Sequence, residues 1–203
     1  MVVRKTRRRK GGRRARVRVG VGALQAYCAK IYADPACAGE CNWFVWTVAE
    51  AFCGAGSHGF GAGRGECSAD GQIDVMSAGN GWTAVTDSDP DATRRAGNIV
   101  DAAIRLAAEG KLVIAGMKST WFAPAQAHGH VAVVIGAPGE YSATAKHVLP
   151  CGYAGSRKAS ARIPMGEHRH LGWSFPAAEW KAIGYWYRAP DRGRSRQAAA
   201  ANT

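Results

Sequence analysis

The chain has 203 residues, of which 47% are hydrophobic and 21% are charged, proportions that are ordinary for one globular domain with a complete core. No segment reaches the roughly 18 consecutive apolar residues of a membrane-spanning helix, and no apolar region follows the basic N-terminal segment, so neither a membrane anchor nor a signal peptide is expected. The formal net charge of +12 resembles that of a nucleic-acid-binding protein, but residues 4–18 hold ten of the 27 basic residues and no acidic one, which leaves a nearly neutral body.

The charge pattern divides the chain into three parts. Residues 1–20 are predicted to form a basic, disordered arm, which is either a solvated tail or a segment that binds nucleic acid, an anionic cell wall or a secretion partner. Residues 21–188 carry the hydrophobic patterns of a single domain, and residues 189–203 are predicted to be a disordered Arg/Ala tail.

Three helices are predicted in the first half of the domain. Apolar residues at helical spacing predict a short helix from Leu24 to Tyr32. The segment that begins at Cys41 predicts a second helix, with Phe44, Val48 and Phe52 on one face and Cys41 in the first turn. Residues 54–71 contain seven glycines and predict a mobile loop. A third helix is predicted after Asp89, its cap, and before Gly110, with an apolar face made by Ile99, Val100, Ala103, Ile104 and Ala107.

Strands follow these helices. Apolar runs predict strands at residues 112–117, 130–135, 147–149 and 183–188, and Ala137-Pro138-Gly139-Glu140 predicts a turn. Helices followed by consecutive strands indicate an α+β domain with a mostly antiparallel sheet.

Cys41 and His130 are the candidate reactive residues. A cysteine at a helix N-terminus faces unpaired backbone N–H groups and the positive end of the helix dipole, which both favour the thiolate. His130 follows a glycine at the start of an apolar strand and could hold the proton and return it to a leaving amine. The alternative is that Cys41 is a small packed residue and His130 a strand-end histidine with ordinary hydrogen bonds.

The motifs in this order resemble the papain-like peptidoglycan cysteine amidases of the NlpC type. They are Cys41-x-x-Phe-Val on a helix, Leu112-Val-Ile-Ala-Gly-Met-Lys118, Gly129-His-Val-Ala-Val-Val-Ile135 and Pro150-Cys-Gly152, within residues 24–188. Among these amidases, the chain resembles family one of the type VI secretion amidase effectors. The loop at residues 118–128 and the segment at residues 156–172 look longer here than in that family.

The resemblance implies roles for particular residues. Cys41 would be the nucleophile, His130 the base and Cys151 the residue that orients the histidine. Because a thiol sulfur is a weak acceptor for an imidazole N–H, His147 remains an alternative to Cys151. His128 lies two residues from His130, and the Gly-His-Val match favours His130.

The resemblance also implies a function. The protein would cut the cell-wall stem peptide, at the D-glutamyl to diaminopimelate bond, in the periplasm of target bacteria. It would be made in the cytoplasm without a signal peptide and would have a cognate immunity protein and a secretion-tube component as partners. Alternatives are a phage or self-encoded lysin with the same site, and a non-enzymatic protein that binds nucleic acid or another anionic polymer through the arm.

No cofactor or metal is expected, because the six cysteines form no Cys-x-x-Cys pair and no histidine pair has the spacing of a zinc site. In an oxidising periplasm, the four cysteines outside the proposed site could form the short bridges Cys28–Cys37 and Cys53–Cys67. They could equally be buried or free thiols, because a sequence does not fix disulfide connectivity.

Overall fold

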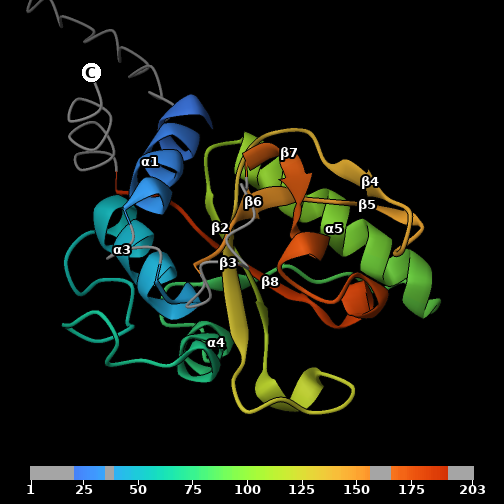
Figure 1. Cartoon of the computed structure of the whole chain (residues 1–203), viewed down its shortest axis with the longest axis horizontal. Coiled ribbons are helices and arrows are strands. Elements are labelled where there is room, and N and C mark those ends of the chain that lie inside the picture. The colour runs from blue at the N-terminus through green and yellow to red at the C-terminus, as the bar shows by residue number, and fades with distance from the viewer. Residues whose placement is uncertain (1–20, 35–38, 156–165, 192–203) are drawn as a thin grey trace, which may run out of the picture.

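The fold is described from a computed structural model, which places residues 21–34, 39–155 and 166–191 (Figure 1). The predicted basic arm, Cys37 and residues 192–203 of the predicted tail lie outside these residues. Residues 189–191 were also assigned to the tail, but the structure places them, and the Asp191 N–H donates a hydrogen bond to the Phe52 carbonyl oxygen at 2.8 Å.

An antiparallel sheet of six strands forms the centre of the described molecule, and it confirms the expected α+β class. In spatial order the strands are β1 (Thr83–Ala84), β8 (Gly184–Arg188), β2 (Leu112–Met117), β3 (His130–Val134), β6 (Cys151–Tyr153) and β7 (Gly166–His170). A separate two-stranded hairpin consists of β4 (Glu140–Ser142) and β5 (His147–Leu149).

The central strands β2 and β3 are apolar, except for His130 at the start of β3, because helices cover both faces of the sheet. All six residues of β2 are buried. In β3, Val131 and Val133 pack into the hydrophobic cluster on one face, whereas Ala132 and Val134 pack into the cluster on the other face. This alternation follows from the two-residue period of a strand.

The first face carries α1 (Val21–Ala33), α3 (Cys41–Cys53) and α4 (Ala69–Ser77), as Figure 1 shows. The predicted apolar face of α3 is confirmed, since Phe44, Val48 and Phe52 are all buried there. The helix α4 was not expected, because its residues follow and partly overlap a glycine-rich stretch that predicts a loop. Ser68 caps α4 by accepting a hydrogen bond from the Gly71 N–H at 3.1 Å.

The second face carries α5 (Ala92–Ala108), which confirms the third predicted helix. Its cap is Asp91 rather than Asp89, because the Asp91 side chain accepts hydrogen bonds from the N–H groups of Thr93 and Arg94 at 2.9 and 2.8 Å. Gly110, at a positive φ of 82°, ends the helix as predicted.

Three short 3-10 helices connect these elements: η1 (Ser119–Trp121), η3 (Leu171–Trp173) and η4 (Ala177–Ala182). The helices η3 and η4 contribute Leu171 and Trp180 to the hydrophobic cluster beneath α5, and Phe175, which lies between these two helices, belongs to the same cluster. Among the described residues, no helix is both long and apolar enough to cross a lipid bilayer.

Candidate functional site

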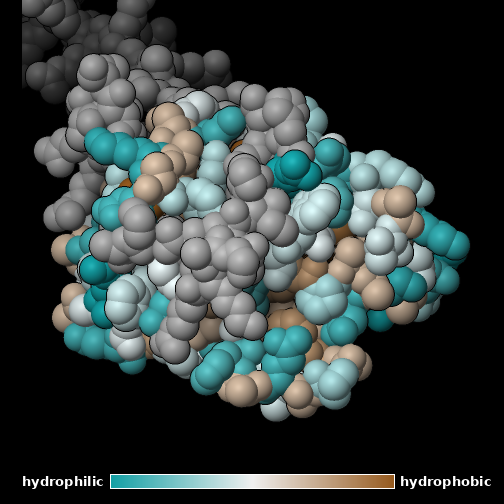
Figure 2. Space-filling view, viewed as in Figure 1, coloured by the Kyte–Doolittle hydropathy of each residue, from teal (hydrophilic) through white to brown (hydrophobic). Residues whose placement is uncertain are grey.

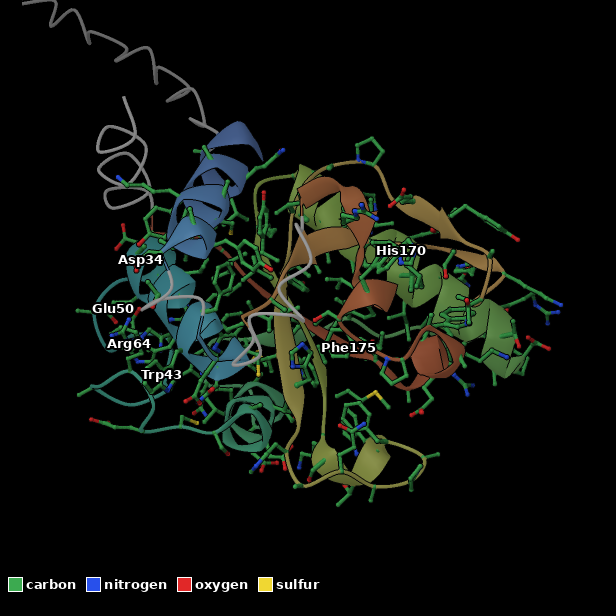
Figure 3. The ribbon with its side chains drawn as sticks, in the orientation of Figure 1. Asp34, Trp43, Glu50, Arg64, His170 and Phe175 are labelled. Atoms are coloured by element: carbon green, nitrogen blue, oxygen red, sulfur yellow. The ribbon has the colours of Figure 1, made fainter. Side chains whose placement is uncertain are left out.

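A cleft of about 1180 Å³ lies where the N-terminus of α3 meets the beginning of β3. Among the described residues, its walls come from the start of α3, the segment 64–70, the segment 122–130, Gly155 and the segment 173–176. Figure 2 shows a hollow in which hydrophobic residues lie between hydrophilic ones, at the place where Figure 3 labels Phe175. Cys41 and His130 both line this cleft.

Cys41 is the first residue of α3, as the sequence predicts. The first hydrogen bond of the helix runs from the Phe44 N–H to the Glu40 carbonyl oxygen at 3.0 Å, which leaves the N–H groups of the first three residues without a partner within the helix. The Asn42 side chain donates to the Cys67 carbonyl oxygen, and Gln72 donates to the Asn42 carbonyl oxygen, each at 2.9 Å. These bonds fix the start of α3 against α4.

The surroundings of the Cys41 thiol act on its pKa in opposite directions. Burial raises the pKa and is the largest effect, and the charge of Glu40 adds to it. The backbone N–H groups of Val131, Asn42 and Cys41 itself face the sulfur and lower the pKa. The net direction is upward, so the helix N-terminus alone does not produce the resting thiolate that the sequence suggests.

His130 is the first residue of β3 and pairs with Met117 on β2. Because the Val131 N–H faces the Cys41 sulfur, the nucleophile candidate lies beside the residue that follows His130. Because side chains alternate between the two faces along β3, His130 lies on the same face of the sheet as Ala132 and Val134. Its ring packs edge to face against Phe175, with 5.0 Å between the ring centroids. Cys41 and His130 therefore approach the same cleft from opposite faces of the sheet, at the end of one strand.

Ser174 is the hydrogen-bond partner of the His130 ring. Its hydroxyl oxygen lies 2.6 Å from His130 Nε2, and it also lines the cleft. Burial lowers the pKa of His130 to about 4, so the imidazole is neutral at neutral pH. If Nε2 carries the proton and donates to Ser174, Nδ1 has the free lone pair of a base.

The structure does not bring Cys151 to His130. The Ile135 N–H donates to the Cys151 carbonyl oxygen at 3.0 Å, so Cys151 lies beside Ile135 and not beside His130. Ile135 directly follows β3 and is five positions from His130, or about 16 Å at the usual rise per residue of a strand. Cys151 is fully buried in the cluster beneath α1 and α3 and is not among the residues that line the cleft.

His147, the alternative to Cys151, is also remote from the cleft lining. It lies on the hairpin strand β5, and its ring stacks on Trp180 at 4.4 Å between centroids. The hydrogen-bond partner of the His130 ring is instead Ser174, which comes from a later segment.

His128 lines the cleft but differs from His130 in its surroundings, because it is exposed and precedes the strand. Gly129 between them is buried, and a Cβ atom there would clash with Asp70 Oδ1. Asp70 accepts hydrogen bonds from the Ser119 N–H at 2.9 Å and from the Ser119 hydroxyl at 2.6 Å. The glycine thus lets α4 hold the loop 118–128 against the cleft.

The described cysteines other than Cys41 have no role at the cleft. Cys28, Cys53, Cys67 and Cys151 are free thiols, so a Cys53–Cys67 bridge is not formed, and Cys37 lies outside the described residues. Burial raises the pKa of Cys53 to about 12. Within the ranges that the structure describes, no group of three or more His, Cys, Asp or Glu side chains is placed to hold a metal ion.

Sequence reasoning missed several residues of the cleft. The Arg64 guanidinium lies 5.1 Å from the ring centroid of Trp43, and the Arg169 guanidinium lies 4.9 Å from the ring centroid of Trp173. Ser174 stands in no motif, so no local signal could identify it. In contrast, Ser68 followed by Ile73 and Met76 is a recognisable helix signal that would have placed Asp70 on a helix.

Comparison with models of known protein families found no match, and no curated protein proved similar to this sequence.

Proposed function

We propose that the protein is a cysteine amidase in which Cys41 is the nucleophile and His130 the base, carried on a papain-like fold of the NlpC type. The observation that supports this most is the position of the Cys41 thiol, at the N-terminus of α3 and facing the backbone N–H of Val131. A helix-borne cysteine and a strand-borne histidine then line one cleft.

The pKa directions favour a reaction that starts from a neutral pair. His130 Nδ1 takes the proton from the Cys41 thiol while the sulfur attacks the carbonyl carbon of a peptide bond. The resulting oxyanion faces the N–H groups at the start of α3, which have no partner within the helix. The imidazolium then gives its proton to the leaving amine, which breaks the C–N bond and leaves a thioester. Water, activated by the same nitrogen, hydrolyses the thioester and restores the thiol.

The substrate in this proposal is the peptide stem of bacterial peptidoglycan, at the D-glutamyl to diaminopimelate bond. The motif resemblance supports this choice, as does a cleft that exceeds the 300–1000 Å³ usual for small ligands. The biological role that goes with it is that of an antibacterial effector, carried by a secretion tube and acting in the periplasm of a target cell. An immunity protein would protect the producer.

The test is digestion of purified sacculi followed by mass spectrometry of the released fragments. The wild type is expected to release peptides with new termini at one bond of the stem, and Cys41→Ala is expected to release none. Alanine is smaller than cysteine, so circular dichroism should show an unchanged fold. Full digestion by Cys41→Ala would contradict the assignment of the nucleophile.

One observation favours a second candidate, a serine hydrolase in the same cleft. The 2.6 Å contact between Ser174 and His130 Nε2 is also the arrangement of a serine nucleophile with its base. In that case Ser174→Ala would abolish hydrolysis and Cys41→Ala would retain it. Cys41 is preferred because backbone N–H groups surround its thiol at a helix N-terminus and can hold an oxyanion.

A further inference from the structure

Trp173 is a large apolar side chain left open in the cleft. Half of its surface is exposed (50%), although it lines the cleft and lies next to Ser174, the partner of His130. The Arg169 guanidinium lies 4.9 Å from its ring centroid, and the His170 ring lies at 6.3 Å. These neighbours cover part of the indole, and half of its surface stays exposed.

The surroundings of Trp173 are polar rather than apolar. Gln126 and His128 are exposed in the same lining and offer donors and acceptors, while the neighbouring Phe175 is 2% exposed and faces the core. A protein partner would be expected to meet a larger apolar patch than a single indole. An exposed aromatic ring with the hydrogen-bonding groups of Arg169 and His170 beside it instead suits a sugar, whose ring has an apolar C–H face and hydroxyl groups at its edge.

We propose that Trp173 is a stacking platform for a pyranose ring that is covalently attached to the peptide substrate. The proposal rests on the proposed amidase function and adds that the enzyme distinguishes glycan-bearing peptides from free ones. Because Trp173 adjoins Ser174, and Ser174 contacts His130, the sugar would bind within a few residues of the scissile bond. Trp43 with Arg64, on the α3 side of the cleft in Figure 3, borders the opposite end of the ligand.

The experiment compares two substrates that share one peptide. The first is a disaccharide-peptide from digested sacculi, and the second is the same peptide after enzymatic removal of the disaccharide. For the wild type, kcat/KM should be about tenfold higher on the glycan-bearing substrate, mainly through KM, which corresponds to about 1.4 kcal/mol. Trp173→Ala should abolish this preference, because kcat/KM should fall about tenfold more on the glycan-bearing substrate than on the free peptide, and Trp173→Phe should restore part of it.

Trp121→Ala is the matched control, because Trp121 is 40% exposed but is not among the described residues of the cleft lining. It should keep the wild-type preference. Equal kcat/KM on both substrates for the wild type would overturn the proposal. An equal loss on both substrates in Trp173→Ala would also overturn it, because it would show general damage near Ser174.

Binding separates this proposal from the proposed function. Cys41→Ala, which cannot cleave, should bind the disaccharide-peptide with quenching of tryptophan fluorescence, and Cys41→Ala/Trp173→Ala should bind it about tenfold more weakly. If the wild type cleaves neither substrate but this difference persists, the amidase assignment fails and the sugar platform stands. If the two variants bind alike, the platform is wrong even where hydrolysis is confirmed.

Discussion

At the scale of single residues, the protonation of His130 couples the candidate site to stability. Burial lowers the pKa of this imidazole to about 4, whereas a histidine in the unfolded chain has a pKa near 6.5. Between these values the unfolded state binds more protons than the folded state, so stability should fall as the pH falls from about 6.5 to about 4. Above about 6.5 this group should contribute no pH dependence.

The variant His130→Gln tests this coupling, because glutamine can keep a bond to Ser174 but does not titrate. Urea unfolding at pH 7 and at pH 4.5 should show a smaller loss of stability in His130→Gln than in the wild type. His128→Gln, at an exposed position of the same cleft, should behave like the wild type. Identical pH dependence in all three proteins would show that His130 is not buried in the neutral form.

Ser174 is expected to act as a positioning residue for His130. Removing its hydroxyl in Ser174→Ala should lower kcat by about 10- to 100-fold with little change in KM, because the ring loses its orientation and not its substrate. Ser174→Thr, which keeps a hydroxyl, should recover part of the loss. Cys151→Ser, at a buried position away from the cleft, should leave kcat unchanged. If kcat falls as much in Cys151→Ser as in Ser174→Ala, Cys151 contributes to catalysis and its assignment outside the site is wrong.

At the scale of elements, α4 positions the loop 118–128 through one carboxylate. Asp70 receives both hydrogen bonds of Ser119, and the Asp70→Ala variant should be destabilised by about 1–3 kcal/mol, the usual cost of losing hydrogen bonds to a charged group. Hydrogen exchange at the Ser119 amide should also accelerate.

Asp74→Ala is the matched control on the same helix. Asp74 pairs with Lys118, and its side chain is 62% exposed, so its loss should change stability by less than about 1 kcal/mol. If the two variants are equally stable and exchange equally, Asp70 does not hold the loop.

Elements that bury one regular face could be predicted from the sequence. The face of α3 at Phe44, Val48 and Phe52 follows from helical periodicity, and the apolar runs of β2 and β3 follow from burial on both sides of the sheet. The approach of Ser174 to His130 could not be predicted, because the residues are 44 positions apart and Ser174 follows a short 3-10 helix without periodicity.

The position of Cys151 relative to His130 could not be predicted from the sequence either. Its place on the strand after the hairpin could be anticipated, but the register of β6 against β3 could not. That register puts Cys151 beside Ile135 instead of His130. A strand's apolar pattern fixes which face a residue occupies and leaves open how far along its neighbour it lies.

At the scale of the whole molecule, charge is distributed very unevenly. Ten of the 27 basic residues lie within residues 4–18, outside the described residues, whereas the rest of the chain is nearly neutral. Charged residues of both signs, including Arg64 and Glu66, line the cleft. Attraction to an anionic polymer is therefore a property expected of the arm and not of the cleft.

Deleting residues 1–18 should separate these two properties. Cleavage of soluble disaccharide-peptides should stay within about twofold of the wild type, because the residues proposed for catalysis all lie in the described domain. Binding to whole sacculi, measured by co-sedimentation, should weaken, and the wild type should lose the same binding as salt is raised, because screening shortens the reach of the arm's charges. A variant with the ten basic residues replaced by glutamine controls for the length of the arm and should match the deletion. Loss of soluble-substrate cleavage in either variant would show that the arm contributes to the active domain itself.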